Sequence, residues 1–174
     1  ISQVYANGGV ALFICIINHF YYHDLMYPCF LASVAAANSD TWGTELGKIS
    51  NKTPIDIISG HETAPGTSGG ITLIGTIGSI LGSLVIGLVG HFFYISFNTL
   101  LLVIISGFLS SIIDSILGST VQARYISADG FIITEKYKKL FYLFTGSNKI
   151  NNDIVNLYCT LSGPFIFLLL FSFI

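Results

Sequence analysis

Three carboxylic acids lie within or beside apolar stretches of this 174-residue chain: Asp40, Glu45 and Asp114. An ionisable side chain inside a membrane-spanning helix costs free energy and is typical of a functional site. Carboxylate oxygens are also ligands that Mg²⁺ prefers. Asp114 lies about 15 Å before the next cation, Arg124, at 1.5 Å of helix per residue, so we expect it to be deep.

Asp114 belongs to a polar stripe. Ser110, Asp114 and Gly118 recur every four residues, and Gln122 follows one turn later. Residues at this spacing share one face of a helix, so we expect the stripe to look into a helical bundle. The alternative is a packing stripe with one hydrogen-bonded acid.

The segment 38–48 is an unusually polar end for an apolar helix. At 100° per residue, Asp40 and Glu45 lie on different faces and cannot both bind one ion from a regular helix. Either the helix unwinds near Gly43, or the two acids have different roles. For Glu45, a simple ion pair with Lys48 three residues later is the alternative to catalysis.

Glycines and hydroxyls precede the next apolar stretch, in the order Gly66-Thr67-Ser68-Gly69-Gly70-Ile71-Thr72. Backbone N–H groups at glycines, hydroxyl donors and the positive end of a helix dipole together favour a phosphate group. The segment is not a Walker motif, because no Gly-Lys-Ser/Thr follows. An ordinary helix cap is the alternative.

Amide side chains begin the last apolar stretch, where Asn152 and Asn156 share a helix face. Two amides one turn apart can hold the water shell of a metal or a ligand's hydroxyls, or bond to a neighbouring helix. Asn7, followed by two glycines, precedes the first apolar stretch.

The composition indicates an integral membrane protein. Hydrophobic residues make up 52% of the chain and charged residues 9%, and the mean hydropathy is +0.76. A soluble domain does not have this composition. The net charge of −2 gives no electrostatic footprint for DNA or RNA, so nucleic-acid binding is excluded.

We expect an all-α fold, a polytopic transmembrane bundle that forms a single domain over residues 1–174. About five spans reach the necessary length, at residues 8–22, 26–45, 70–93, 97–121 and 154–174. Gly78 and Gly82 offer a small face for close helix packing. Because the chain starts at Ile1, close to an apolar stretch, we expect it to be a fragment or processed form whose own N-terminal signals are missing.

The cationic residues predict the orientation. All seven occur in the two long polar links, residues 46–69 and 122–153: Lys48, Lys52, Arg124, Lys136, Lys138, Lys139 and Lys149. Five spans place both links on one side of the membrane, and the positive-inside rule makes that side cytoplasmic. The five polar segments described above meet at the same end, which predicts a membrane-embedded polar site facing a phosphorylated lipid.

Five motifs in a fixed order resemble the integral membrane family that includes plant phytyl-phosphate kinase of the vitamin E pathway: ANGG, ANSDTWGTELGK, PGTSGGIT, SSIIDSILGSTVQARY and INNDIVN. The arrangement from Asp40 through Lys48 to Gly69-Gly70 is similar, more distantly, to dolichol kinase and phosphatidate cytidylyltransferase. The resemblance implies a CTP-dependent, Mg²⁺-assisted kinase that converts an isoprenyl monophosphate into its diphosphate. It also implies that the full-length protein has further spans before the ANGG motif. The positions that match the family are Asn7, Asp40, Glu45, Lys48, Thr67, Gly69, Gly70, Asp114, Gln122, Asn151, Asn152 and Asn156.

We therefore expect a membrane enzyme whose partners are a nucleotide and an isoprenyl phosphate; its oligomeric state is not predicted. The expected residues are, for catalysis, Asp40, Glu45, Lys48 and Asp114; for the nucleotide, Asn7, Thr67, Ser68, Gly69, Gly70 and Gln122; and for Mg²⁺, Asp40, Asp114, Asn152 and Asn156. Two alternatives stay open. One is a transporter or flippase for a phosphorylated or anionic solute, and the other is a non-catalytic membrane scaffold.

Overall fold

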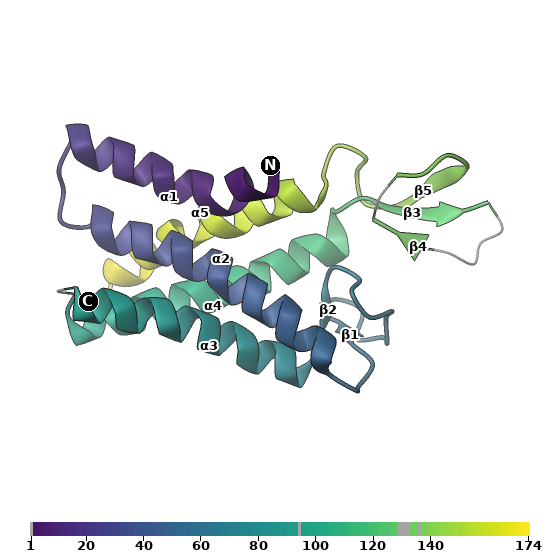
Figure 1. Cartoon of the computed structure of the whole chain (residues 1–174), viewed down its shortest axis with the longest axis horizontal. Coiled ribbons are helices and arrows are strands. Elements are labelled where there is room, and N and C mark those ends of the chain that lie inside the picture. The colour runs from purple at the N-terminus through teal and green to yellow at the C-terminus, as the bar shows by residue number, and fades with distance from the viewer. Residues whose placement is uncertain (1, 94, 129–132, 136) are drawn as a thin grey trace.

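Five helices make up most of the described chain. The computed structural model describes residues 2–93, 95–128, 133–135 and 137–174. The helices are α1 (Ser2–Phe20), α2 (Met26–Ile49), α3 (Leu73–Phe92), α4 (Phe97–Thr120) and α5 (Asn152–Phe171). They lie alongside one another as a bundle (Figure 1), so the predicted helical fold class is confirmed.

Four of these helices, α1, α3, α4 and α5, are long and apolar enough to cross a membrane. The remaining predicted span, residues 26–45, corresponds to α2, which is not among the four. The position of α2 explains its more polar sequence, because it packs against each of the other four helices. A helix surrounded by protein needs fewer apolar residues than one that faces lipid.

The helix α3 meets α2 through small residues. Its buried side carries Gly78 and Gly82, as predicted, and a Cβ on Gly82 would lie 2.7 Å from the backbone oxygen of Asn38. Asn38 in turn donates its side-chain amide to the Gly82 carbonyl at 2.8 Å. The large apolar side chains of α3, such as Leu73 and Ile77, point outward and are exposed.

Two predicted helix starts are wrong. The helix α1 begins at Ser2, so Asn7 and its two glycines lie inside the helix rather than before it. The helix α3 begins at Leu73 rather than residue 70. Thr72 caps α3, because its side-chain oxygen accepts a hydrogen bond from the Gly75 N–H at 3.0 Å.

Short strands, which the sequence did not predict, occupy both polar links. The first link forms an antiparallel pair, β1 (Ile55–Asp56) with β2 (Gly70–Ile71). The second forms a three-stranded sheet of β3 (Arg124–Ser127), β4 (Ile133–Thr134) and β5 (Phe141–Thr145), in the order β4-β3-β5. Figure 1 shows this sheet projecting beyond one end of the bundle.

Polar and apolar interiors occupy different halves of the bundle. The apolar core lies mostly toward the end that carries the α1–α2 and α3–α4 turns, and consists of Val10, Ile14, Cys29, Leu31, Ala32, Ala35, Ile95, Leu100, Leu102, Val103 and Phe167. Toward the other end many of the buried side chains are polar, among them Ser79, Ser111, Gln122 and Asn156. Buried polar groups need partners, so this half is where a ligand can be held.

Candidate functional site

A polar cavity of about 160 Å³ opens at the end of the bundle that carries the strands. Four helices and the loop before β2 contribute to its wall. We call it the acidic cavity, and its lining is Gln3, Asn7, Asp40, Thr41, Thr44, Glu45, Gly66, Thr67, Ser68, Gly69, Gly70, Asp114, Ser115, Asn152 and Asn156. Most of the predicted site residues are therefore brought together, although they come from five separate segments.

The acids Asp40 of α2 and Asp114 of α4 meet in this wall. Their carboxyl groups lie close enough to share a hydrogen bond when one of them is protonated, and both side chains are half-buried. Two carboxylates this close repel unless a proton or a cation lies between them. The pair therefore fits a cation-binding role. Asp40 and Asp114 are 74 positions apart in the sequence (114 − 40), so only the packing of α2 against α4 brings them together.

Amide side chains surround this pair. In the amide orientation that satisfies its neighbours, Asn156 donates to Asp114 Oδ2 and to the Asn152 backbone oxygen, each at 3.3 Å. Asn156 is buried, whereas Asn152 is exposed at the rim. Asn7 approaches from α1 on the same cavity wall. The neighbouring Asn151 caps α5, since its side-chain oxygen accepts from the Ile154 N–H at 3.1 Å.

The donor set fits Mg²⁺ better than a transition metal. Among the described residues, no group of three His, Cys, Asp or Glu side chains is placed to hold a metal ion. Mg²⁺ is commonly held by one or two carboxylates and keeps several waters. Asp40 and Asp114 supply the two carboxylates, and the amide oxygens and hydroxyls of the cavity can bind the waters.

Glu45 and Lys48 form an ion pair, as the simpler of the two interpretations predicted. Lys48 Nζ lies 2.6 Å from Glu45 Oε1, and both side chains are more than half exposed. The helix α2 continues without a break from Met26 to Ile49, so it does not unwind near Gly43. Asp40 and Glu45 consequently have different partners, Asp114 and Lys48. Of the two predicted possibilities, the unwound helix is therefore wrong, and separate roles for the two acids remain the prediction.

The loop 66–70 turns through two left-handed glycines, Gly66 (φ +82°) and Gly69 (φ +83°). A Cβ on Gly69 would lie 2.6 Å from Ser119 Cβ, so this loop packs directly on the end of α4. A side chain at Gly69 would be strained by both its φ angle and this contact. The glycine-rich segment is thus a loop held against α4, not the first turn of α3.

Several hydrogen bonds hold this loop in place. Glu135, which follows β4, accepts from the Ser68 N–H at 2.7 Å, and the buried Gln122 amide donates to both Ser68 Oγ and Glu135 at 2.9 Å. Arg124 donates to the backbone oxygens of Ser68 and Gly118. Ser68 N–H and Gln122 Nε2, which were predicted to bind nucleotide, are therefore engaged within the protein.

Asp56 completes this network, and the sequence analysis overlooked it. Its Oδ2 accepts from the Ser119 hydroxyl at 2.7 Å and lies 3.8 Å from Arg124. Burial would raise the pKa of Asp56, but hydrogen bonds from the Ser59 N–H, the Ser119 hydroxyl, the Ile58 N–H and the Ser59 hydroxyl outweigh it and lower the pKa to about 2. Asp56 is therefore charged at neutral pH and ties the first link to α4.

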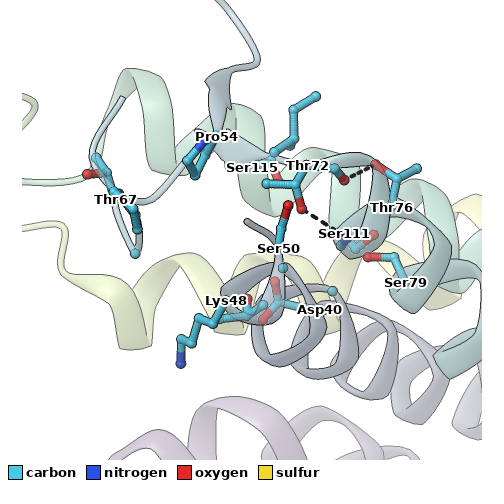
Figure 2. Close-up of a pocket in the computed structure, with 18 of the residues that line it drawn as sticks. Asp40, Lys48, Ser50, Pro54, Thr67, Thr72, Thr76, Ser79, Ser111 and Ser115 are labelled. Atoms are coloured by element: carbon cyan, nitrogen blue, oxygen red, sulfur yellow. Dashed lines mark hydrogen bonds between the residues drawn. The ribbon is translucent and has the colours of Figure 1, made fainter. Parts of the chain in front are cut away.

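A second cavity of about 100 Å³ lies between α2, α3 and α4, next to the acidic cavity. Figure 2 shows the hydroxyl groups that line it, including those of Ser50, Thr72, Thr76 and Ser111. We call it the hydroxyl cavity. Lys48 also lines it, but its side chain extends away from these hydroxyls in Figure 2 and pairs with Glu45.

Comparison with known proteins agrees with this membrane architecture. The chain is 29% identical over 171 residues to an uncharacterized membrane protein of Methanocaldococcus jannaschii, covering 98% of this chain and 62% of that protein. It is 33% identical over 100 residues to Protein PGR of Arabidopsis thaliana, covering 51% of this chain and 35% of that protein. The chain thus spans about three fifths of the archaeal relative and about a third of the plant one. No solved structure matches the chain significantly.

A family model described as integral membrane protein DUF92 matches residues 1–164. This match includes all five helices except the C-terminal end of α5, and it includes every residue that lines the acidic cavity. The predicted resemblance to an integral membrane family with plant members is confirmed at that level. The chain belongs to the integral membrane protein family DUF92.

Proposed function

We propose that this chain forms the phosphoryl-transfer site of a membrane enzyme that converts a prenyl monophosphate into its diphosphate at the expense of a nucleoside triphosphate, CTP by the resemblance described above. The observation that carries the proposal is the contact between the Asp40 and Asp114 carboxyls in a polar cavity. Phosphoryl transfer requires acids that hold Mg²⁺ and hydrogen-bond donors that position phosphate groups, and this cavity offers facing acids beside backbone amides, hydroxyls and amide side chains.

The reaction needs little from a general base. The acceptor is already a phosphate oxyanion, whose oxygen forms the new bond to the γ-phosphorus while the bond to the bridging oxygen breaks and the nucleoside diphosphate leaves. Positioning and charge neutralisation therefore dominate. Mg²⁺, when bound, would neutralise the phosphate oxygens. Asp40 and Asp114 would hold it, and Asn156 would fix the orientation of Asp114 through its 3.3 Å hydrogen bond.

The surroundings of the acidic cavity favour a lipid phosphate over a soluble one. Asn7 and Asn156 reach the cavity from α1 and α5, whose neighbouring side chains Val4, Tyr5 and Leu157 are exposed and apolar. In a bilayer these side chains face hydrocarbon. A prenyl chain can then lie along this flank while its phosphate enters the polar cavity.

The test uses the full-length parent protein in lipid vesicles with Mg²⁺ and a prenyl monophosphate, following diphosphate formation from CTP, ATP and GTP. We expect Asp40→Asn and Asp114→Asn each to lower kcat at least 100-fold, roughly the loss of a strong electrostatic contact to the reacting groups. Asp24→Asn is the matched control, because Asp24 precedes α2 at the opposite end of the bundle.

Folded variants are required for this comparison, so each is checked by size-exclusion profile and thermal unfolding. Product formation that survives in both Asp40→Asn and Asp114→Asn would refute the proposed metal pair. No product with any nucleotide, over several prenyl chain lengths, would refute the kinase itself and favour a transporter for an anionic solute, which would then be sought by solute binding without nucleotide.

A further inference from the structure

The hydroxyl cavity and the acidic cavity share one wall. Asp40 and Thr44 of α2, Thr67 and Gly70 of the loop, and Ser115 of α4 line both cavities. Thr44 is exposed and Ser115 is half-buried, so the partition between the cavities is made of small side chains at the surface of the site. An elongated ligand can therefore occupy both cavities at once.

The two cavities differ in chemistry. The acidic cavity is lined by both carboxylates and by the amides, whereas the hydroxyl cavity has only Asp40 of that pair and carries the neutral hydroxyls of Thr76, Ser79 and Ser111. Its cations, Lys48 and Lys52, are exposed at the edge. Thr76 donates to the Thr72 carbonyl and Ser111 to the Phe108 carbonyl, so these two hydroxyl oxygens act as acceptors toward a ligand. Such a lining suits an uncharged group that is rich in hydroxyls or amines.

Of the two substrates of the proposed reaction, one has such a group. A prenyl monophosphate consists of a phosphate and a hydrocarbon chain, while a nucleoside triphosphate ends in a ribose and a base. We infer that the hydroxyl cavity binds the nucleoside end of the donor, with the triphosphate passing Thr44 and Ser115 into the acidic cavity. This inference rests on the proposed function and assigns a place to the donor within it.

The size of the hydroxyl cavity is consistent with this assignment. A cavity of about 100 Å³ has room for roughly three waters at their liquid volume of about 30 Å³ each. That space accommodates a ribose ring or a single-ring base, with the rest of the nucleoside extending toward the opening near Lys52. Thr76 and Ser111 line this cavity and do not line the acidic one. Substitutions at these two residues therefore test the binding of the nucleoside end separately from that of the triphosphate.

The experiment measures equilibrium binding to the full-length parent protein in nanodiscs, with Mg²⁺ and without acceptor. The ligands are CTP, inorganic tripolyphosphate and, separately, a prenyl monophosphate. The variants are Thr76→Val and Ser111→Ala, which remove a hydroxyl with little change in shape. We expect each variant to raise the Kd for CTP roughly 2- to 12-fold, as the loss of one hydrogen bond predicts, and to leave the other two Kd values unchanged.

Matched controls for both variants exist in α4. Thr120 donates to the Ile116 carbonyl at 2.7 Å, as Thr76 donates to the Thr72 carbonyl at 3.0 Å, and Thr120 lines neither cavity. Ser106 is a buried serine of α4 whose hydroxyl donates to the Leu102 carbonyl. Thr120→Val and Ser106→Ala should therefore leave all three Kd values at the wild-type level.

The outcomes separate this inference from the proposed function. CTP binding that is unchanged in Thr76→Val and Ser111→Ala, in a wild-type protein that binds and uses CTP, would overturn the nucleoside assignment and leave the kinase standing. Equal weakening of CTP and tripolyphosphate would also overturn it, because the variants would then disturb the phosphate end. A wild-type protein that binds no nucleotide at all would overturn both.

Discussion

The acids at the strand-bearing end of the bundle show that the same side chain can serve different purposes. Glu45 is exposed and pairs with a lysine, Glu135 accepts a hydrogen bond from Ser68 of the loop 66–70, and Asp56 accepts one from Ser119 of α4. Asp40 and Asp114 instead face each other. Only the environment distinguishes a structural carboxylate from one that can bind a cation, and the environment comes from residues far away in the sequence.

Asp56 leads to a prediction about pH. Its folded-state pKa of about 2 is lower than the value near 3.9 expected in an unfolded chain. The carboxylate therefore stabilises the first link fully above about pH 4, and this contribution is lost as the pH falls toward 2. Amide hydrogen exchange of Ile58 and Ser59, corrected for intrinsic rates, should show their protection decreasing over that interval, because both N–H groups donate to Asp56.

The substitution Asp56→Asn should imitate the acidic state at neutral pH. We expect it to reduce the local stability of this link by about 1–3 kcal/mol and to remove most of the pH dependence between 2 and about 4. Glu62→Gln is the matched control, because Glu62 is an exposed acid of the same link. Unchanged protection in Asp56→Asn would show that the Asp56 hydrogen bonds are not what holds the link.

At the scale of elements, the helices could be predicted from sequence and the strands could not. A run of about 20 apolar residues commits to a helix in a bilayer because every backbone group must be bonded within it. The strands β1 and β2 have two residues each, and their pairing joins Ile55 to Ile71 across a long loop. Such pairing leaves no periodic pattern. The pairing of β1 with β2 also explains why α3 starts at Leu73 rather than at residue 70, since Gly70 and Ile71 belong to β2.

The contact between α2 and α3 gives a prediction about stability. A Cβ on Gly82 would lie 2.7 Å from the Asn38 backbone oxygen, a distance that forces the two helix backbones apart. We expect Gly82→Ala to destabilise the protein by about 1–3 kcal/mol, the usual cost of overpacking. Thermal unfolding in detergent should show a lower Tm.

The control for Gly82→Ala is Gly8→Ala in α1. A Cβ on Gly8 would meet nothing within 4 Å, so the change should be neutral or stabilise the helix by up to about 1 kcal/mol. If both substitutions shift the Tm equally, the close approach of α2 and α3 would not be the reason for glycine at position 82.

At the scale of the whole molecule, the sequence predicted where the polar segments meet but not how they are joined. Counting spans places the ends of five segments together, and the acidic cavity contains them. The hydrogen bonds that join the two links could not be predicted, because Glu135 bonds to Ser68 across 67 positions of sequence and Gln122 bonds to it across 54. No local pattern marks such partners. Arg124, a cation four residues after the end of α4, is the one sign in this part of the sequence.

The orientation of the bundle is the last prediction. Every described Lys and Arg lies at the end that carries the acidic cavity, in the last turn of α2 or in the two links, while Lys136 lies outside the described residues. The positive-inside rule therefore predicts that this end faces the cytoplasm. A nucleotide donor is available on that side, so the proposed function requires the same orientation.

Single-cysteine labelling decides the orientation. The free cysteines Cys15, Cys29 and Cys159 are first replaced by alanine, and Thr53→Cys or Tyr21→Cys is then introduced to mark the two ends. A membrane-impermeant maleimide applied to intact cells should label Tyr21→Cys and spare Thr53→Cys, and inverted vesicles should give the reverse. Labelling of Thr53→Cys in intact cells would place the acidic cavity outside the cytoplasm, where a nucleotide-dependent reaction would lack its donor, and would favour the transporter alternative.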